Sequence, residues 1–544
     1  MQGLNLVPAR VSLLAVDRLS LDSGGGTVRN LIVCCDGTWN TRDQKRHDVP
    51  VPTNVVRIYN AVAEADANGN AQLRYYHPGV GAGGSLLERL AGGAFGAGLS
   101  RNIMSAYKWL CSSYIPGDRI FMFGFSRGAF TVRSLAGMVG MLGLLDLSDI
   151  SEEDAWGRVK KAYEKGYRKK QDRSKWAKDW VFHRDAQGND AVIVDFLGAW
   201  DTVGALGIPD SLALLNIFDP SKKYSFHDLK LGSHVLTARH AVAIDEMRAS
   251  FTPTLWENVS EHADAREVWF PGVHSNVGGG YVDTGLSDIA LEWMMKKAEG
   301  AGLGLKQGMA EQLSPDSKGI LYDSCKGIYK HMPTCPRSIP AIISKNSGES
   351  VHPSALERQT EPPISQAPYR RTILLSPGES MEVDVFAVEP WNDTGLYMEA
   401  GRTYRLEASG QWMDLNIKCG PCGANDGKFN VEKLAYIAGT SLGKLQGIFR
   451  RISGNKSADC MFTRREDDIP WFALVGAVAN AGNPGKDGTP ASHEIFPVCP
   501  GSGKVPVTRI TPGKSGYLYA FANDAWNFYG NNRGSVQMKI TCIG

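Results

Sequence analysis

From residue 30 to about residue 340, short apolar runs alternate with segments whose apolar residues recur at helical spacing. Residues 31–35 and 119–123 are continuous apolar runs, and residues 53–65 and 99–113 have the periodicity of amphipathic helices. Strands of a parallel sheet are apolar throughout because helices cover both faces, and strands that alternate with helices typically build such a sheet. The pattern therefore predicts an α/β fold with a mostly parallel sheet over this part of the chain.

Helical periodicity ends near residue 370, where short apolar or alternating runs take over. Clusters of Gly, Asn and Pro separate these runs, which cover residues 371–375, 381–388, 403–409, 471–478, 515–522 and 535–541. Many short strands with such turns predict an antiparallel β-sandwich. The polar, proline-bearing stretch before them has the composition of a linker. The predicted organisation is an N-terminal tail (1–28), an α/β domain (29–345), a linker (346–369) and a C-terminal all-β domain (370–544).

The motif Gly124-Phe125-Ser126-Arg127-Gly128 follows the second apolar run directly. Small and apolar residues follow it in turn, as in a helix packed under a sheet. A strand, Gly-x-Ser-x-Gly and a helix in this order form the nucleophile elbow of an α/β-hydrolase. Glycines on both sides let the backbone turn sharply, so that the serine hydroxyl stands clear. Ser126 is therefore the predicted nucleophile.

A serine nucleophile needs a histidine base and a carboxylate that orients this base, in the chain order serine, acid, histidine. His274 lies in a glycine-flanked loop just after a strand-like run, and we predict it as the base. Asp201 is the predicted acid, because it ends a buried strand that runs into a glycine-containing loop. Asp245 also lies between Ser126 and His274. Its surroundings look helical, and a surface or salt-bridged carboxylate is the simpler interpretation.

Negative charge that develops on the substrate carbonyl oxygen needs backbone N–H donors. One predicted donor is the N–H of Arg127, the residue after the nucleophile. The other is expected in the loop after the first strand, where Gly37 and Thr38 are the candidates. Asp36 in the same loop has no cluster of His or Asp beside it, which favours a loop-fixing role over metal binding.

Composition and charge argue against several classes of protein function and location. The chain of 544 residues has a net charge of +2, so nothing indicates a nucleic-acid partner. The apolar stretch 134–147 is too short and too rich in glycine to cross a bilayer. Residues 1–26 lack the apolar core and the cleavage site of a secretory signal. The charged stretch 147–190 is either a solvated helix face or a surface that meets anionic head groups.

Ten cysteines are scattered along the chain. Only Cys419-Gly420-Pro421-Cys422 has a motif spacing. No βαβ pattern surrounds it, which argues against a redox site and favours a local disulfide or a plain turn.

Six ordered segments, including the serine motif, carry a resemblance to a known family. They are residues 35–40, 53–55, 78–81, 124–129, 200–204 and 272–281. Over roughly residues 29–340 the chain resembles the α/β-hydrolase domain of the type VI secretion lipase effectors, which are phospholipases A that bacteria inject into rivals, and of related uncharacterised bacterial and fungal proteins. The resemblance implies that Ser126, Asp201 and His274 act on glycerophospholipid esters without a cofactor.

The same resemblance implies partners and a location. The expected partners are membrane phospholipid as substrate and a type VI spike or an immunity protein. Synthesis in the bacterial cytoplasm without a signal peptide, followed by delivery to the periplasm of a target cell, is the expected route.

The C-terminal region resembles a calcium-dependent galactose-binding lectin domain of the Pseudomonas PA-I type, through residues 404–412 and 522–535. The resemblance implies calcium ligands of the oxygen type that this ion prefers. They are Asp524, the Phe528 carbonyl, Asn531, Asn532 and, in addition, Asp414. A plain Asn/Gly-rich hairpin is the alternative. Carbohydrate is a further candidate ligand, although no equivalent of the lectin's sugar-contacting His-Pro-x-Gln segment is present.

The leading hypothesis is thus a serine esterase that acts on lipids and carries a C-terminal β-domain for docking. The alternative is a lectin-like binding protein whose hydrolase fold has little or no turnover. A peptidase is disfavoured, because nothing in the sequence indicates a peptide-binding edge.

Overall fold

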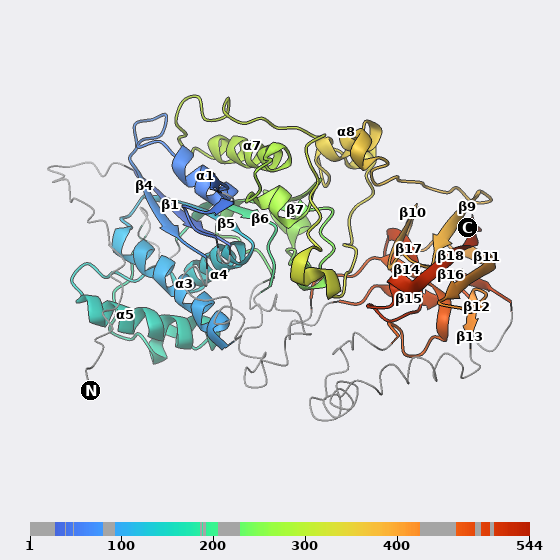
Figure 1. Cartoon of the computed structure of the whole chain (residues 1–544). Helices are drawn as coiled ribbons and strands as arrows, with labels where there is room; N and C mark the ends of the chain where they lie inside the picture. The colour runs from blue at the N-terminus through green and yellow to red at the C-terminus, as the bar shows by residue number, and fades with distance from the viewer. Residues whose placement is uncertain are drawn as a thin grey trace, which may run out of the picture.

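The computed structural model describes residues 28–37, 40–46, 48–79, 93–184, 188, 192–204, 229–424, 464–484, 491–500 and 505–544. An α/β domain and an all-β domain lie side by side (Figure 1). Among the described residues, no helix is long and apolar enough to cross a membrane.

The first domain is built on a six-stranded sheet of order β4-β1-β5-β6-β7-β8. Every neighbouring pair in this sheet is parallel, which confirms the predicted fold class. The strands are β1 (Asn30–Cys35), β4 (Gln72–His77), β5 (Arg119–Phe125), β6 (Val194–Trp200), β7 (Val235–Ala243) and β8 (Ala265–Phe270). β1 is buried along its whole length, because helices cover both faces of the sheet.

Helices α1 (Asn54–Ala61) and α7 (Gly285–Gly300) cover one face, and α3 (Gly93–Ser113), α4 (Arg127–Leu142) and α5 (Glu152–Lys161) lie on the other (Figure 1). The side chain of Thr53 caps α1 by accepting the N–H of Val56. Each face has its own apolar core, with Phe121, Phe123 and Phe196 in the first and Leu31, Met122 and Leu135 in the second. The charged stretch after α4 forms α5 and the π-helix Ala162–Arg168.

The C-terminal domain consists of two antiparallel sheets, as expected for a β-sandwich. One contains β10 (Asn392–Met398), β13 (Cys422–Ala424), β14 (Trp471–Ala479), β15 (Glu494–Pro497) and β17 (Gly516–Ala522). The other contains β9 (Ser380–Phe386), β11 (Tyr404–Asp414), β12 (Ile417–Cys419), β16 (Val507–Ile510) and β18 (Asn532–Cys542). Leu406, Trp412 and Val536 of the second sheet pack with Leu474 and Leu518 of the first in one buried core.

Three local expectations differ from the structure. The surroundings of Asp245 are not helical, because β7 runs to Ala243 as a buried central strand. Residues 371–375 form no strand and share only one bridge, Ile373 to Leu396. Of the two alternatives for the Cys-Gly-Pro-Cys motif, the local disulfide is wrong, because Cys422 is joined to Cys499, 77 residues away. Cys419 ends β12, where it pairs with Trp412 of β11.

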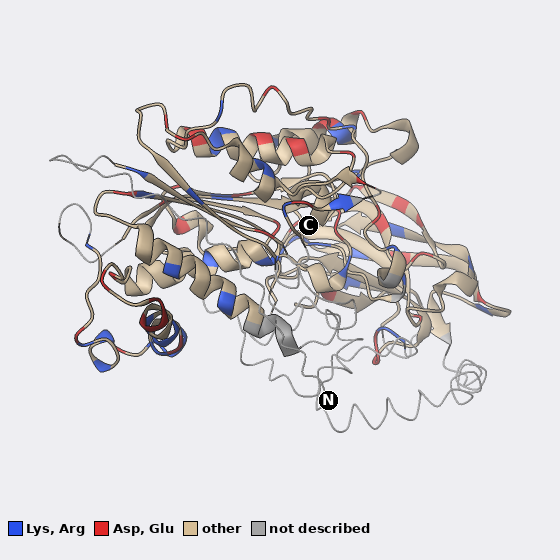
Figure 2. Ribbon diagram, turned by 60° about the vertical axis from the view of Figure 1, so that its left-hand side comes forward, with Lys and Arg blue, Asp and Glu red and all other residues tan. Residues whose placement is uncertain are grey.

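The segment with linker composition contains α8 (Pro353–Thr360). Arg358 of this helix is completely buried and donates hydrogen bonds to the carbonyls of Ser317 and Gly319. Acidic and basic residues are interspersed over both domains (Figure 2).

Candidate active site

Ser126 lies in the turn between β5 and α4, at the carboxyl edge of the sheet. Its backbone is left-handed, with φ 58° and ψ −123°. A Cβ on Gly124 would lie 2.4 Å from the Gly128 carbonyl oxygen, and a Cβ on Gly128 would lie 2.0 Å from the Cys35 carbonyl oxygen. The turn therefore requires both glycines, and its geometry is that of a nucleophile elbow.

The fold brings Asp201 and His274 to the same edge of the sheet. Trp200 of β6 pairs with Phe125 of β5, so Asp201 and Ser126 leave adjacent strands at the same level. His274 comes shortly after β8 and begins α6 (His274–Gly278). Its Nδ1 lies 2.5 Å from Asp201 Oδ2, and its ring centroid lies 4.6 Å from that of Phe125. The imidazole is thus bonded to the acid, and it lies against the ring of the residue before the serine, with an angle of 34° between the ring planes.

Within the described part of the chain, the Ser126 hydroxyl is not hydrogen-bonded to His274. Catalytic hydrogen bonds of this kind are often long in ligand-free structures and tighten only when substrate binds.

Arg337 balances the charge of Asp201. Its Nη1 donates to Asp201 Oδ1 at 2.6 Å, and its Nη2 donates to Asp201 Oδ2 at 3.0 Å. The same two nitrogens also donate to the carbonyls of Ala243 and Phe251, each at 2.7 Å. Burial raises the pKa of Asp201, but the charge of Arg337 and the hydrogen bond to His274 outweigh burial and hold this pKa well below its usual range. Asp201 is therefore ionised at neutral pH.

His274 is enclosed by aromatic and charged side chains. Its backbone N–H donates to Glu246 at 3.3 Å, and Glu246 forms a two-point ion pair with Arg248. The ring of Phe251 lies 5.0 Å from the imidazole, and the Arg248 guanidinium lies over Phe251 at 3.5 Å. Burial lowers the pKa of His274, although the hydrogen bond and charge of Asp201 oppose this shift. The imidazole is therefore neutral at neutral pH, as a general base requires.

The carboxylate of Asp245, the alternative acid, is hydrogen-bonded to residues other than His274. Its carboxylate accepts the N–H of Gly272 at 2.8 Å, the hydroxyl of Tyr369 at 2.9 Å and the Nε of Arg370 at 2.7 Å. These bonds fix the loop before His274 and tie it to the chain that leads into the β-domain. The salt-bridged interpretation of Asp245 is confirmed.

Two of the three predicted oxyanion donors can be placed. Arg127 begins α4, so its N–H lies at a helix N-terminus beside Ser126. Gly37 also lies beside Ser126, because a Cβ on Gly37 would be 3.2 Å from the Cβ of Ser126. Its N–H donates to Asp36 Oδ1 at 2.7 Å in this structure. Thr38 lies outside the described residues.

Asp36 fixes the loop after β1, as its sequence context suggested. Its second carboxylate oxygen accepts hydroxyl protons from Thr53 and Tyr76, both at 2.8 Å. Burial raises the pKa of Asp36 to about 6, although these hydrogen bonds act in the opposite direction.

The five predicted calcium ligands lie at one end of the β-sandwich. Asp414 ends β11 and pairs in register with Asn532 of β18. Asp524 is fully buried and accepts the Asn532 side-chain N–H at 3.0 Å, while the Phe528 carbonyl accepts the N–H of Asn531. The side-chain oxygens of Asn531 and Asn532 are buried and have no hydrogen-bond partner. The described residues contain no group of three or more His, Cys, Asp or Glu side chains that could hold a metal ion, so a cation here would need amide and carbonyl oxygens in addition to the two carboxylates.

Sequence reasoning missed Arg337 and Glu246. Arg337 lies 136 residues after Asp201 and has no motif around it. Glu246 directly follows Asp245, which the sequence offered as the alternative catalytic acid. A buried charge that serves another charged residue leaves no local pattern, so only the three-dimensional arrangement identifies it.

Comparison with known proteins shows which family this part of the chain is similar to. Residues 29–297 match the model of the family described as T6SS, phospholipase effector Tle1-like, catalytic domain. This part of the chain is therefore similar to a Tle1-like catalytic domain. The match includes Ser126, Asp201 and His274 and ends before Arg337.

A curated relative of this chain is the uncharacterized protein YEL023C of Saccharomyces cerevisiae. The two are 34% identical over 241 residues, which cover 41% of this chain and 32% of the relative. The chain thus spans about a third of the length of that relative.

Three solved structures are similar at low identity. An uncharacterized protein from Pseudomonas aeruginosa is 20% identical, with a TM-score of 0.32, over 54% of this chain and 49% of that protein. The Tle1 effector, solved bound to the VgrG spike of the type VI secretion system, is 17% identical, with a TM-score of 0.29, over 52% of this chain and 58% of the effector. The EclA N-terminal domain, a PllA-like lectin, is 16% identical, with a TM-score of 0.17, over 30% of this chain and 94% of the lectin.

Proposed function

We propose that the α/β domain is a serine esterase that hydrolyses acyl esters of glycerophospholipids. The observation that carries the proposal is the 2.5 Å contact between His274 Nδ1 and Asp201, at the edge of the sheet where Ser126 occupies a nucleophile elbow. The assignment of residues 29–297 to a phospholipase effector family supports phospholipid as the substrate class.

In this mechanism, His274 Nε2 accepts the Ser126 hydroxyl proton while the Ser126 oxygen attacks the ester carbonyl. Asp201 holds the Nδ1 proton and stabilises the imidazolium. The Arg127 N–H and a donor from the 37–38 loop would stabilise the oxyanion by hydrogen bonds. For Gly37 to serve, its N–H has to turn from Asp36 to the substrate. The imidazolium then protonates the leaving alcohol, and water, activated by His274, hydrolyses the acyl-enzyme.

The test is hydrolysis of bilayer vesicles of phosphatidylethanolamine and phosphatidylglycerol by the wild type and by Ser126→Ala. The wild type is expected to release fatty acid and lysophospholipid, and Ser126→Ala is expected to be slower by at least about a thousandfold. Equal release by both folded proteins would reject Ser126 as the nucleophile. The absence of release by the wild type would favour a lectin-like binding protein with no turnover.

The delivery route and the partners are proposed on the family assignment alone. It supports synthesis in a bacterial cytoplasm, transfer to the periplasm of a target cell, carriage on a type VI spike and inhibition by an immunity protein. Co-purification of the chain with spike proteins of its own host would test the carriage step.

We further propose that the end of the β-sandwich holds a calcium ion. Two buried amide oxygens without partners, on Asn531 and Asn532, support this, because such groups cost free energy unless a donor or a cation satisfies them. Asp524 and Asp414 would supply the negative charge. No contact in the described structure favours carbohydrate as a ligand.

A further inference from the structure

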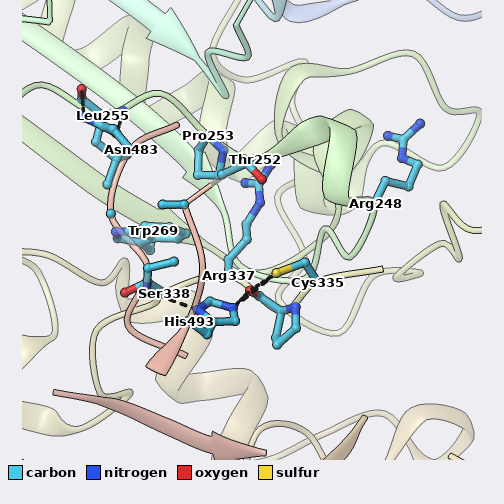
Figure 3. A pocket seen from close by; sticks show the side chains of 14 residues that line it. Arg248, Thr252, Pro253, Leu255, Trp269, Cys335, Arg337, Ser338, Asn483 and His493 are labelled. Carbon is cyan, nitrogen blue, oxygen red and sulfur yellow. Dashed lines mark hydrogen bonds between the residues drawn. The ribbon is translucent and has the colours of Figure 1, made fainter. Parts of the chain in front are cut away.

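The C-terminal domain contacts the α/β domain next to Asp201. A pocket at this junction is lined from one side by Arg248, Thr252, Arg337 and neighbouring residues, and from the other side by Asn483 and His493 of the β-domain (Figure 3). The chain from Cys335 to Arg337 runs between the two sides.

His493 anchors this segment. Its Nδ1 accepts the N–H of Ala481 at 3.1 Å, so its Nε2 carries the proton and donates to the Pro336 carbonyl at 2.8 Å. The Cys335 sulfur also lies 3.2 Å from this Nε2. Figure 3 shows these bonds, with the Arg337 side chain extending from the segment away from His493.

Arg337 is fixed at both ends. Its backbone follows directly on the residue held by His493, and its guanidinium donates to Asp201 and to two backbone carbonyls. The side chain is only 2% exposed, so little water is available to replace these bonds.

A second contact supports the loop on the other side of Asp201. Asn483 of the β-domain makes two hydrogen bonds to the backbone of Leu255, at 2.7 and 2.9 Å. The preceding residue, Thr254, donates its N–H to the carbonyl of Thr202 at 2.8 Å. The β-domain thus stabilises the chain on two sides of the acid.

We propose that Arg337 is a positioning residue for Asp201 and that His493 holds Arg337 in place, so that the all-β domain is a structural part of the active site. The inference rests on the proposed esterase function and adds to it. The α/β domain alone contains Ser126, Asp201 and His274. Without the all-β domain, however, Asp201 would not be held in the position that orients His274.

The test is steady-state hydrolysis of a short-chain soluble ester by the full chain, with kcat, KM and the pH profile of kcat/KM measured for each variant. Arg337→Gln is expected to lower kcat by on the order of tenfold to a hundredfold with little change in KM, because a misplaced acid misorients the base. The acid limb of the pH profile should move to higher pH, because Asp201 without its cation holds the imidazolium more tightly. Arg337→Lys should retain the acid limb of the wild type but not its kcat, because a lysine cannot make the bidentate contact.

His493→Ala is expected to lower kcat in the same direction, and the double variant His493→Ala/Arg337→Gln should be no slower than Arg337→Gln alone. Tyr517→Phe is the matched control. It removes a hydroxyl that accepts the Ile342 N–H at the same junction but does not touch the Arg337 segment, and its kcat should equal that of the wild type.

A folded His493→Ala protein with the kcat of the wild type, losses that multiply in the double variant, or an unmoved acid limb in Arg337→Gln would each overturn the inference. If Arg337→Gln does not melt cooperatively, it is not correctly folded, and the kcat values of Arg337→Lys and His493→Ala test the inference instead. A wild type that does not hydrolyse the ester contradicts the proposed function instead.

Discussion

Ser126 and Asp201 both adopt a left-handed backbone, with φ of 58° and 39°, although neither is a glycine. Such conformations cost on the order of 1–3 kcal/mol each and persist only where surrounding contacts impose them. Around Asp201 these contacts include its N–H bond to Ala241 and the bond from Thr202 N–H to His240. Two strained residues at the ends of adjacent strands support the proposal that the active site lies at this edge of the sheet.

The buried imidazole leads to an expected pH dependence. His274 must be neutral to accept a proton, and burial lowers its pKa from the ordinary value of about 6.5. Neutral imidazole therefore persists as the pH falls below this value, and the acid limb of kcat/KM should lie below about pH 6.5. The measurement is the pH profile with a soluble ester whose own ionisation is constant. An acid limb clearly above pH 7 would contradict the described environment of His274.

Among the secondary-structure elements, the junction of β5 with α4 determines the position of Ser126, the proposed nucleophile. Gly128, in the first turn of this helix, lies so close to β1 that a methyl group would overlap the Cys35 carbonyl. We expect Gly128→Ala to lower the free energy of unfolding by roughly 1–3 kcal/mol, as for other overpacked sites, and to displace Ser126. Denaturant unfolding and ester hydrolysis measure the two effects.

Gly157 provides the matched control for this substitution. It lies in α5, and a Cβ there would have no atom within 4 Å. Gly157→Ala should stabilise the protein by about 0.5–1 kcal/mol, because alanine favours a helix more than glycine does. Similar destabilisation by both substitutions would show that the Gly128 contact is not the cause.

Elements marked by a continuous apolar run or by a motif were predictable from the sequence. The apolar runs of β1 and β5 and the Gly-x-Ser-x-Gly turn belong to this group, because each element is specified by its own residues. Strands such as β10 and β16 were missed, since their seven and four residues form neither a continuous apolar run nor a clear alternation. The surroundings of Asp245 were misjudged as helical, because a strand buried on both faces and a buried helix segment have similar apolar composition.

The site could be predicted only in part. Ser126 and His274 lie in glycine-rich turns after strands, and such turns can be recognised in the sequence. Glu246 contacts His274, Arg337 contacts Asp201, and His493 contacts Pro336 beside Arg337. These pairs come from distant parts of the chain, and no sequence spacing connects them. The pairing of Cys422 with Cys499 was unpredictable for the same reason.

Over the whole molecule, the two domains have separate cores and meet in a further apolar cluster. It combines Ile244 and Trp269 of the first domain with Ile339 and Ile342 of the following chain and with Tyr517 and Tyr519 of the second domain. Together with the hydrogen bonds of His493, Asn483 and Tyr517, this cluster joins the domains through the chain that carries Arg337. We therefore expect the two domains to unfold in a coupled manner.

Calcium should stabilise the β-domain if the Asp524 site binds it. A ligand that binds only the folded state adds roughly 3 kcal/mol at a concentration one hundred times its Kd. The wild type should melt at a higher temperature in calcium than in chelator, and Asp524→Ala should lose this difference. Coincident wild-type curves would leave this end of the sandwich as a plain hairpin.

The most direct test of the account is covalent labelling with a fluorophosphonate, which reacts with activated serine nucleophiles, followed by mass spectrometry of the modified peptide. The wild type should carry the adduct on Ser126, and Ser126→Ala should remain unlabelled. Labelling of the wild type at another residue, or equal labelling of both folded proteins, would contradict the assignment of Ser126 as the nucleophile of this fold.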